Sequence, residues 1–166
     1  MMTIQARETL PPRVGTAHPL REYPRNSPRA KARLLVLALL ADGRLDKREF
    51  ESLAERGVYA ALGLHRDDFI AVLMDFCHDA ARLPTGRGSY LLSPAILRGL
   101  FAEVAGQSER KALMQHIFAI ICSDGQLDAG EERLFWQAVE AWDMKVADIS
   151  TDSRTAATMP SVAQRR

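Results

Sequence analysis

Apolar residues recur at spacings of three or four between residues 28 and 145, which is the pattern of helices that bury one face. No segment alternates apolar and polar residues for long enough to predict a strand. The pattern therefore predicts an all-α fold, a compact bundle of about six or seven helices. The expected helices cover residues 28–40, 47–62, 67–83, 94–105, 109–122 and 129–144.

Residue types at the helix ends support these boundaries. Ser27-Pro28 and Ser93-Pro94 each place a capping hydroxyl before a proline that suits the first helical position. Ser108 is expected to cap the fifth helix in a similar way. Glycine follows the expected helix ends at positions 43, 63, 106 and 125, where a left-handed backbone conformation can close a helix.

An internal repeat gives the bundle its expected organisation. The octapeptide at residues 42–49 recurs at residues 124–131 with five of eight positions identical, in the pattern D-G-x-L-D-x-x-E. Each copy follows an apolar helix and precedes an amphipathic one, which predicts a duplicated helix–turn–helix unit. We therefore expect the two turns to lie close together at the surface, related by approximate twofold symmetry.

The first interpretation of the repeat is helix capping. Asp–Gly ends one helix, and the second aspartate of the pattern caps the next. Asp46 with Glu49, and Asp128 with Glu131, would each form a capping box. This interpretation explains every residue of the pattern without a ligand.

The second interpretation is a metal site, because the pattern matches positions five to twelve of an EF-hand calcium loop. Positions one and three of such a loop would be apolar residues in both copies, so a full EF-hand is excluded. A weak or shared site for calcium or magnesium is the most that this interpretation allows. The candidate ligands are Asp42, Asp46 and Glu49 in the first copy and Asp124, Asp128 and Glu131 in the second.

The doubled pattern resembles the TerB family, which is named for tellurite resistance and is similar to the N-terminal region of DjlA-type co-chaperones. An apolar helix ends in Ala-Asp-Gly or Ser-Asp-Gly, and an apolar residue, an acid and a glutamate follow, twice in a small helical protein. The resemblance covers residues 28–145. Gly130 departs from a strong helix start, because glycine weakens a helix by up to ~1 kcal/mol, so the second box is expected to be looser than the first.

The resemblance implies a bundle of about seven helices with internal pseudo-symmetry and an acidic patch near the two turns. That patch would hold a divalent cation or dock protein partners through the six acidic residues named above. The family is associated with stress, metal resistance and membrane-linked complexes, and no catalytic activity is established for its domain. It therefore implies a non-enzymatic interaction or regulatory module.

Charge is distributed unevenly along the 166 residues, although 22 Lys and Arg against 21 Asp and Glu leave a net charge of only +1. Residues 1–33 carry a net charge of +5, whereas residues 34–145 carry −5. We expect a disordered, basic, proline-rich arm over residues 1–27, a helical domain over 28–145 and a disordered tail over 146–166. The arm suggests an alternative function, an adaptor that contacts nucleic acid or an anionic membrane.

Other chemistry finds little support in the sequence. Cys77 and Cys122 form no CxxC pair, and Cys77 is expected to lie with Met74 on the apolar face of the third helix. The longest apolar run has eight residues, far fewer than the ~20 that span a bilayer, and no signal peptide is evident. We expect a cytoplasmic protein without enzymatic activity, with Trp136 and Trp142 packed in the core.

Overall fold

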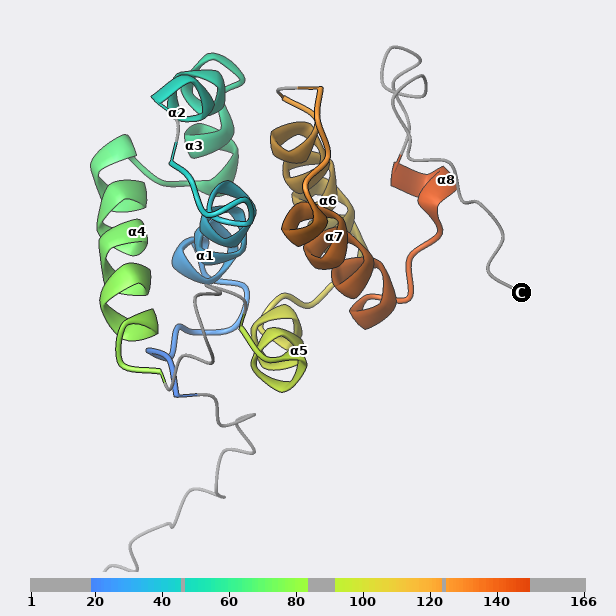
Figure 1. Ribbon diagram of the computed structural model, residues 1–166, viewed down its shortest axis with the longest axis horizontal. Helices are drawn as coiled ribbons and strands as arrows, with labels where there is room; N and C mark the ends of the chain where they lie inside the picture. Colours follow the sequence, from blue (N-terminus) through green and yellow to red (C-terminus); the bar gives the residue numbers. More distant parts are fainter. Residues whose placement is uncertain (1–18, 46, 84–91, 124, 150–166) are drawn as a thin grey trace, which may run out of the picture.

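The structure is a computed structural model that describes residues 19–45, 47–83, 92–123 and 125–149. These residues form eight helices and no strand, which confirms the prediction of a compact all-α bundle (Figure 1). The helices are α1 (Pro28–Leu39), α2 (Lys47–Glu55), α3 (Val58–Leu62), α4 (Arg66–Ala80), α5 (Pro94–Ala102), α6 (Gln107–Ile121), α7 (Ala129–Ala141) and α8 (Val146–Ile149).

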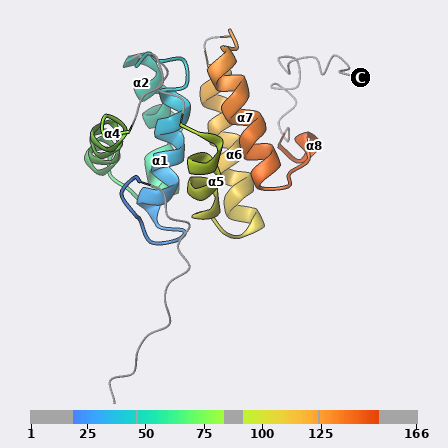
Figure 2. The same ribbon diagram turned by 60° about the horizontal axis from the view of Figure 1, so that its bottom comes forward.

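The central element is α1. Residues 32–39 are all buried, because α4 packs on one side of α1 and α6 on the other, while α3, α5 and α7 also contact it. Figure 2 shows α1 between α4 and the pair formed by α6 and α7. A helix with apolar residues on every side requires neighbours on every side, and the run that starts at Leu34 has this character.

Several helix boundaries differ from the sequence prediction, and two of these differences change its interpretation. The helix expected over residues 47–62 is divided into α2 and α3 at Gly57, whose φ of 65° belongs to the left-handed region. The fifth expected helix begins two residues earlier than predicted, after Gly106 with a φ of 91°. Ser108 therefore lies inside α6 as an exposed residue, and the prediction that it caps this helix is wrong.

The buried face of α4 is narrower than predicted. It consists of four apolar residues, Phe69, Val72, Leu73 and Phe76, which follow spacings of three and four. The carboxylate of Asp79 is buried on the same helix. Met74 is 63% exposed and Cys77 is also exposed, so neither belongs to the buried face. Partial desolvation by its neighbours nevertheless raises the pKa of the Cys77 thiol, which favours the less reactive protonated form.

The described chain begins before α1, in residues 19–27, which we call the N-terminal strap. Leu20 is only 4% exposed, and the backbone N–H of Arg21 donates a 3.0 Å hydrogen bond to the Asp79 carboxylate of α4. Asn26 adopts a φ of 59°; its N–H donates to the carbonyl of Glu103, and its side-chain oxygen accepts from Ala105. The prediction of a disordered arm is therefore wrong for residues 19–27, whereas residues 1–18 lie outside the described part.

A buried arginine joins the strap to the bundle. Arg33 of α1 is 2% exposed and pairs with the Glu103 carboxylate at 2.5 Å. Its guanidinium also donates to the carbonyl of Arg21 and lies 4.6 Å from the centre of the Tyr23 ring. A buried cation requires such compensation, so the strap supplies part of the environment that allows Arg33 to lie beside the core.

The described chain also continues beyond residue 145, to Ile149. The short helix α8 packs against α6 and buries Ile149. The predicted tail over residues 146–166 therefore begins too early, and residues 150–166 lie outside the described ranges. Within those ranges, no helix combines the length and the apolar character that crossing a bilayer requires.

The two halves of the bundle repeat the same backbone geometry at the turns. Leu40 and Cys122 follow α1 and α6 with φ of −101° and −89° and ψ of 3° and 4°. Gly43 and Gly125 come next with φ of 77° and 74°. This local agreement supports the predicted duplication of a helix–turn–helix unit.

Candidate functional site

The second copy of the repeat forms a complete capping box at the start of α7. The Asp128 carboxylate accepts a 2.7 Å hydrogen bond from the N–H of Gly130, and the Glu131 carboxylate accepts a 2.9 Å bond from the N–H of Asp128. Glu131 is only 7% exposed. These oxygens compensate backbone donors that a helix start leaves without intrahelical partners, so the capping interpretation is confirmed for this copy.

The first copy has a different set of described contacts. The Asp42 carboxylate accepts a 2.8 Å hydrogen bond from the N–H of Arg44, which forms a tight turn after α1. Glu49 lies half-buried in the first turn of α2, and Lys47 pairs with Glu51 at 3.3 Å. Asp46, the expected cap of α2, lies outside the described residues, as does Asp124 of the second copy.

The described acidic residues do not assemble into a metal site. Within ranges 19–45, 47–83, 92–123 and 125–149, no group of three or more His, Cys, Asp or Glu side chains could hold an ion. Two of the six expected ligands, Asp46 and Asp124, are outside those ranges. The metal interpretation thus stays a prediction.

The two turns lie next to each other, as predicted. A methyl group on Gly130 would overlap the carbonyl oxygen of Ala41 and lie 3.1 Å from its carbonyl carbon. The start of α7 therefore packs directly on the end of α1, and only glycine permits this approach. The prediction that the second box is looser than the first stays a prediction, because Asp46 of the first box lies outside the described residues. Gly130 itself is required by tertiary packing.

The opposite pair of elements makes the reciprocal contact. The end of α6, with His116 and Ser123, borders a small hollow whose other wall is Glu49 and Arg56 of the α2 region. Burial lowers the pKa of His116, and the nearby positive charge of Arg56 lowers it further. The α2 region and the end of α6 thus line one hollow, as the start of α7 packs on the end of α1, and this similarity agrees with twofold-related units.

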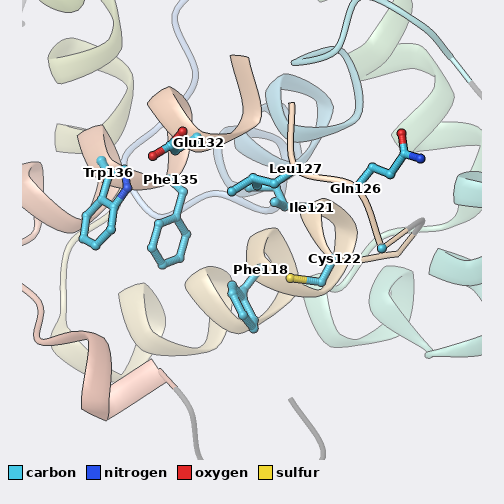
Figure 3. A pocket seen from close by; sticks show the side chains of 9 residues that line it. Phe118, Ile121, Cys122, Gln126, Leu127, Glu132, Phe135 and Trp136 are labelled. Atoms are coloured by element: carbon cyan, nitrogen blue, oxygen red, sulfur yellow. The ribbon is translucent and has the colours of Figure 1, made fainter. Parts of the chain in front are cut away.

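A larger hollow of about 110 Å³ lies between α6 and α7, beside the second turn. Figure 3 shows Phe118 and Cys122 of α6 on one side of it and Phe135 of α7 pointing toward Phe118, with Leu127 between the helices. The Phe118 and Phe135 rings are 5.7 Å apart, and Trp136 packs edge-on against Phe135 at 5.3 Å. The walls are thus predominantly apolar and aromatic, which is typical of a binding hollow.

The hollow is the feature that the sequence interpretation missed. Trp142 is buried, as expected, and its indole N–H donates to the carbonyl of Phe101 at 2.9 Å. Trp136, however, is only partly buried at the wall of the hollow, and Leu127 of the repeat is 41% exposed. The sequence contained one indication of this apolar surface, because the repeat places a leucine in each charged turn. The structure shows that both leucines are exposed, Leu127 at 41% and Leu45 at 49%.

Acidic partners within the bundle compensate much of the positive charge assigned to the arm. Arg21 pairs with Asp75, Arg29 with Asp68 at 3.5 Å, Lys31 with Glu109 at 2.5 Å and Arg33 with Glu103. Four of the seven basic residues in positions 1–33 therefore contribute to packing the chain on itself. Arg7 and Arg13 lie outside the described residues.

Comparison of the chain with protein families, curated proteins and solved structures gives no match.

Proposed function

We propose that this chain is a non-catalytic, TerB-like protein-binding module that acts in tellurite or stress resistance and contacts its partner through the α6–α7 hollow. The single observation that carries the proposal is an aromatic hollow with an exposed leucine at its rim. Apolar residues arranged around a concavity are a common feature of protein-binding sites, because burying them in a partner stabilises the complex. The resemblance of the repeat to TerB supplies the stress-related role.

A site-specific cross-link tests this function. The photoreactive residue p-benzoyl-phenylalanine replaces Leu127 in cells that naturally produce the protein and are exposed to tellurite. Met74 on α4 is the matched control, because it is another large apolar side chain that is well exposed, at 63%, on a different element. We expect a discrete protein adduct from position 127 and none from position 74. The absence of an adduct, or the same adducts from both positions, would contradict the proposal.

Divalent-cation binding at the two turns is a separate part of the proposal. The double change Asp128→Asn with Glu131→Gln preserves the hydrogen bonds of the capping box but removes both charges. If the turns bind calcium or magnesium with millimolar affinity, a ~10 mM concentration of the ion stabilises the parent by about 1.4 kcal/mol. We expect this increase in melting temperature in the parent and not in the double variant. A parent whose melting temperature is unchanged would leave capping as the sole role of Asp128 and Glu131.

The nucleic-acid and membrane alternative is less well supported. It requires free positive charge on the arm, whereas Arg21, Arg29, Lys31 and Arg33 all have acidic partners within the bundle. Charges compensated in this way contribute less to electrostatic association with phosphates.

A further inference from the structure

The two halves of the chain correspond beyond the repeated octapeptide. The α2–α3 region contains the break at Gly57, whereas α7 is continuous, and after this break equivalent residues are 80 rather than 82 positions apart. The N–H of Leu64 donates to the carbonyl of Tyr59 at 2.9 Å, and that of Met144 donates to the carbonyl of Val139 at 3.0 Å. The helix that follows begins at residue 66 in the first half and at residue 146 in the second.

This correspondence makes α8 the counterpart of the first turn of α4. Phe69 of α4 is fully buried, and Ile149 at the equivalent position of α8 is 4% exposed. In the first half, however, α4 continues to Ala80 and packs along α1, whereas the described part of α8 ends at Ile149. Figure 1 shows α4 along the outer side of α1, with only the single turn of α8 in the corresponding place beside α6 and α7.

The first half shows what such a helix covers. Val36, Leu39 and Leu53 are at most 2% exposed, and Phe69 of α4 packs edge-on against Phe50 with ring centres 6.1 Å apart. The counterparts of Val36, Leu39 and Leu53 in the second half are Phe118, Ile121 and Phe135, which line the α6–α7 hollow and are each at most 6% exposed. The apolar surface left accessible at the hollow belongs to Leu127, which is 41% exposed, and to the partly buried Trp136. The hollow therefore lies where the second half has no described counterpart of α4.

The sequence after α8 does not repeat the apolar face of α4. Aspartate, serine and alanine stand at positions 152, 153 and 156, which correspond to Val72, Leu73 and Phe76. A helix buries a face only if apolar residues follow its period, and this segment lacks them. Residues 150–160 therefore lack the apolar face with which α4 completes the first half.

We propose that the α6–α7 hollow binds an amphipathic helix of a partner protein, seated as α4 is seated in the first half. The helix presents apolar side chains at positions i, i+3, i+4 and i+7, the spacing of Phe69, Val72, Leu73 and Phe76. Glu132 occupies the position that Phe50 has in the first half, so a lysine or arginine on the partner helix next to its first apolar residue complements the rim. This inference rests on the proposed function, because it names the partner element for the same site.

An intramolecular graft tests whether the hollow accepts such a helix. In the full chain, residues 150–160 are replaced by the sequence of residues 70–80, so that α8 continues with the apolar face of α4. The matched control is the same graft with serine at positions 152, 153 and 156. We expect the apolar graft to melt roughly 5 °C or more above both the parent and the serine graft, because it covers the hollow.

Tryptophan fluorescence reports where the graft binds. Trp142 is already buried, so a shift of the emission to shorter wavelength and weaker acrylamide quenching would come from Trp136 at the hollow. We expect both changes with the apolar graft and neither with the serine graft. An apolar graft that is helical by circular dichroism but leaves melting and quenching as in the serine graft would overturn the inference.

The cross-link from Leu127 separates this inference from the proposed function. The apolar graft should abolish the partner adduct, and the serine graft should retain it. An adduct that persists with the apolar graft would overturn helix binding in the hollow while the protein-binding function stands. If the parent gives no adduct, the proposed function fails, and the melting and quenching data still decide whether the hollow accepts a helix. A cross-link within purified protein to residues 150–166, or to a second copy, would overturn the partner assignment.

Discussion

Gly130 demonstrates at the scale of one residue how tertiary contact overrides local preference. Alanine at a helical position is normally more favourable than glycine by about 1 kcal/mol. In this fold the carbonyl group of Ala41 occupies the space of the missing side chain, and a backbone group cannot rotate away. The close approach brings the two repeat turns together, so this glycine contributes to the arrangement of the whole site.

The substitution Gly130→Ala should therefore destabilise the protein by about 2 kcal/mol, the middle of the usual range for overpacking. Ser108→Ala is the matched control, because Ser108 holds the second helical position of α6 but is exposed, and we expect a change within about 0.5 kcal/mol. Urea denaturation of the three proteins measures both effects. Equal or greater stability of the Gly130 variant would contradict the contact with Ala41.

His116 gives the stability a dependence on pH. Its pKa in the folded protein is lowered below the ordinary 6.5, first by burial and then by the charge of Arg56, with Glu49 also at the same hollow. The unfolded chain then binds more protons than the folded one as the pH falls through 6.5. Stability contributed by the neutral imidazole is therefore present above this pH and is lost below it.

We expect the free energy of unfolding to decrease between pH 7.5 and pH 5.5, and His116→Gln to decrease less over the same interval. Glutamine is polar but does not titrate, so the difference between the two slopes isolates the imidazole. Denaturation curves at several pH values measure it. Parallel curves for the two proteins would show that the folded and unfolded states hold this proton equally.

Among the elements, the N-terminal strap differs most from its sequence-based prediction. Prolines and positive charge indicated a disordered arm, but residues 19–27 pack between α4 and α5 through Leu20, Arg21 and Asn26. The strap in turn stabilises the buried charge of Arg33, whose guanidinium donates to the Arg21 carbonyl and lies over the Tyr23 ring. The strap is thus part of the folded bundle.

Truncating the strap's apolar anchor tests this conclusion. Leu20→Ala should lower the free energy of unfolding by about 2–3 kcal/mol, the lower part of the range for a buried leucine. Leu45→Ala is a suitable control, because Leu45 is 49% exposed in the first turn and should change stability little. Thermal or urea denaturation provides the comparison. Equal stabilities of the Leu20 variant and the parent would indicate that the strap is not docked in solution.

At the scale of the whole molecule, four cations of the described N-terminal region are paired with carboxylates of the bundle. Cations of the strap and α1 pair with carboxylates of α4, α6 and the segment after α5. In the sequence alone, the same positive charges suggest contact with nucleic acid or a membrane. The remaining net charge is only +1. Electrostatic association with a polyanion depends on the number of phosphates that free cations can neutralise.

We therefore expect no retardation of duplex DNA in a gel-shift assay at ~50 mM salt, where electrostatic affinity is strong. Vesicles containing an anionic lipid should likewise not sediment with the protein. The control is the same assay with a known basic DNA-binding protein. Retardation that disappears with rising salt would restore the nucleic-acid alternative.

The sequence by itself determined the helical class, most helix positions and the duplicated turn, because these depend on apolar periodicity, capping residues and glycines that act within a few positions. The capping role of Asp128 and Glu131 is local in the same sense. Four of the six proposed ligand residues are described, and their membership in a metal site stays a prediction.

Only the tertiary structure decided which faces meet. The need for glycine at position 130, the burial of Arg33 and the docking of Leu20 arise from residues far apart in the sequence. The α6–α7 hollow is of the same kind, since Phe118 and Phe135 look like ordinary core residues in their own helices. Periodicity indicates that a face is apolar, but whether another helix covers it depends on how the elements pack in space.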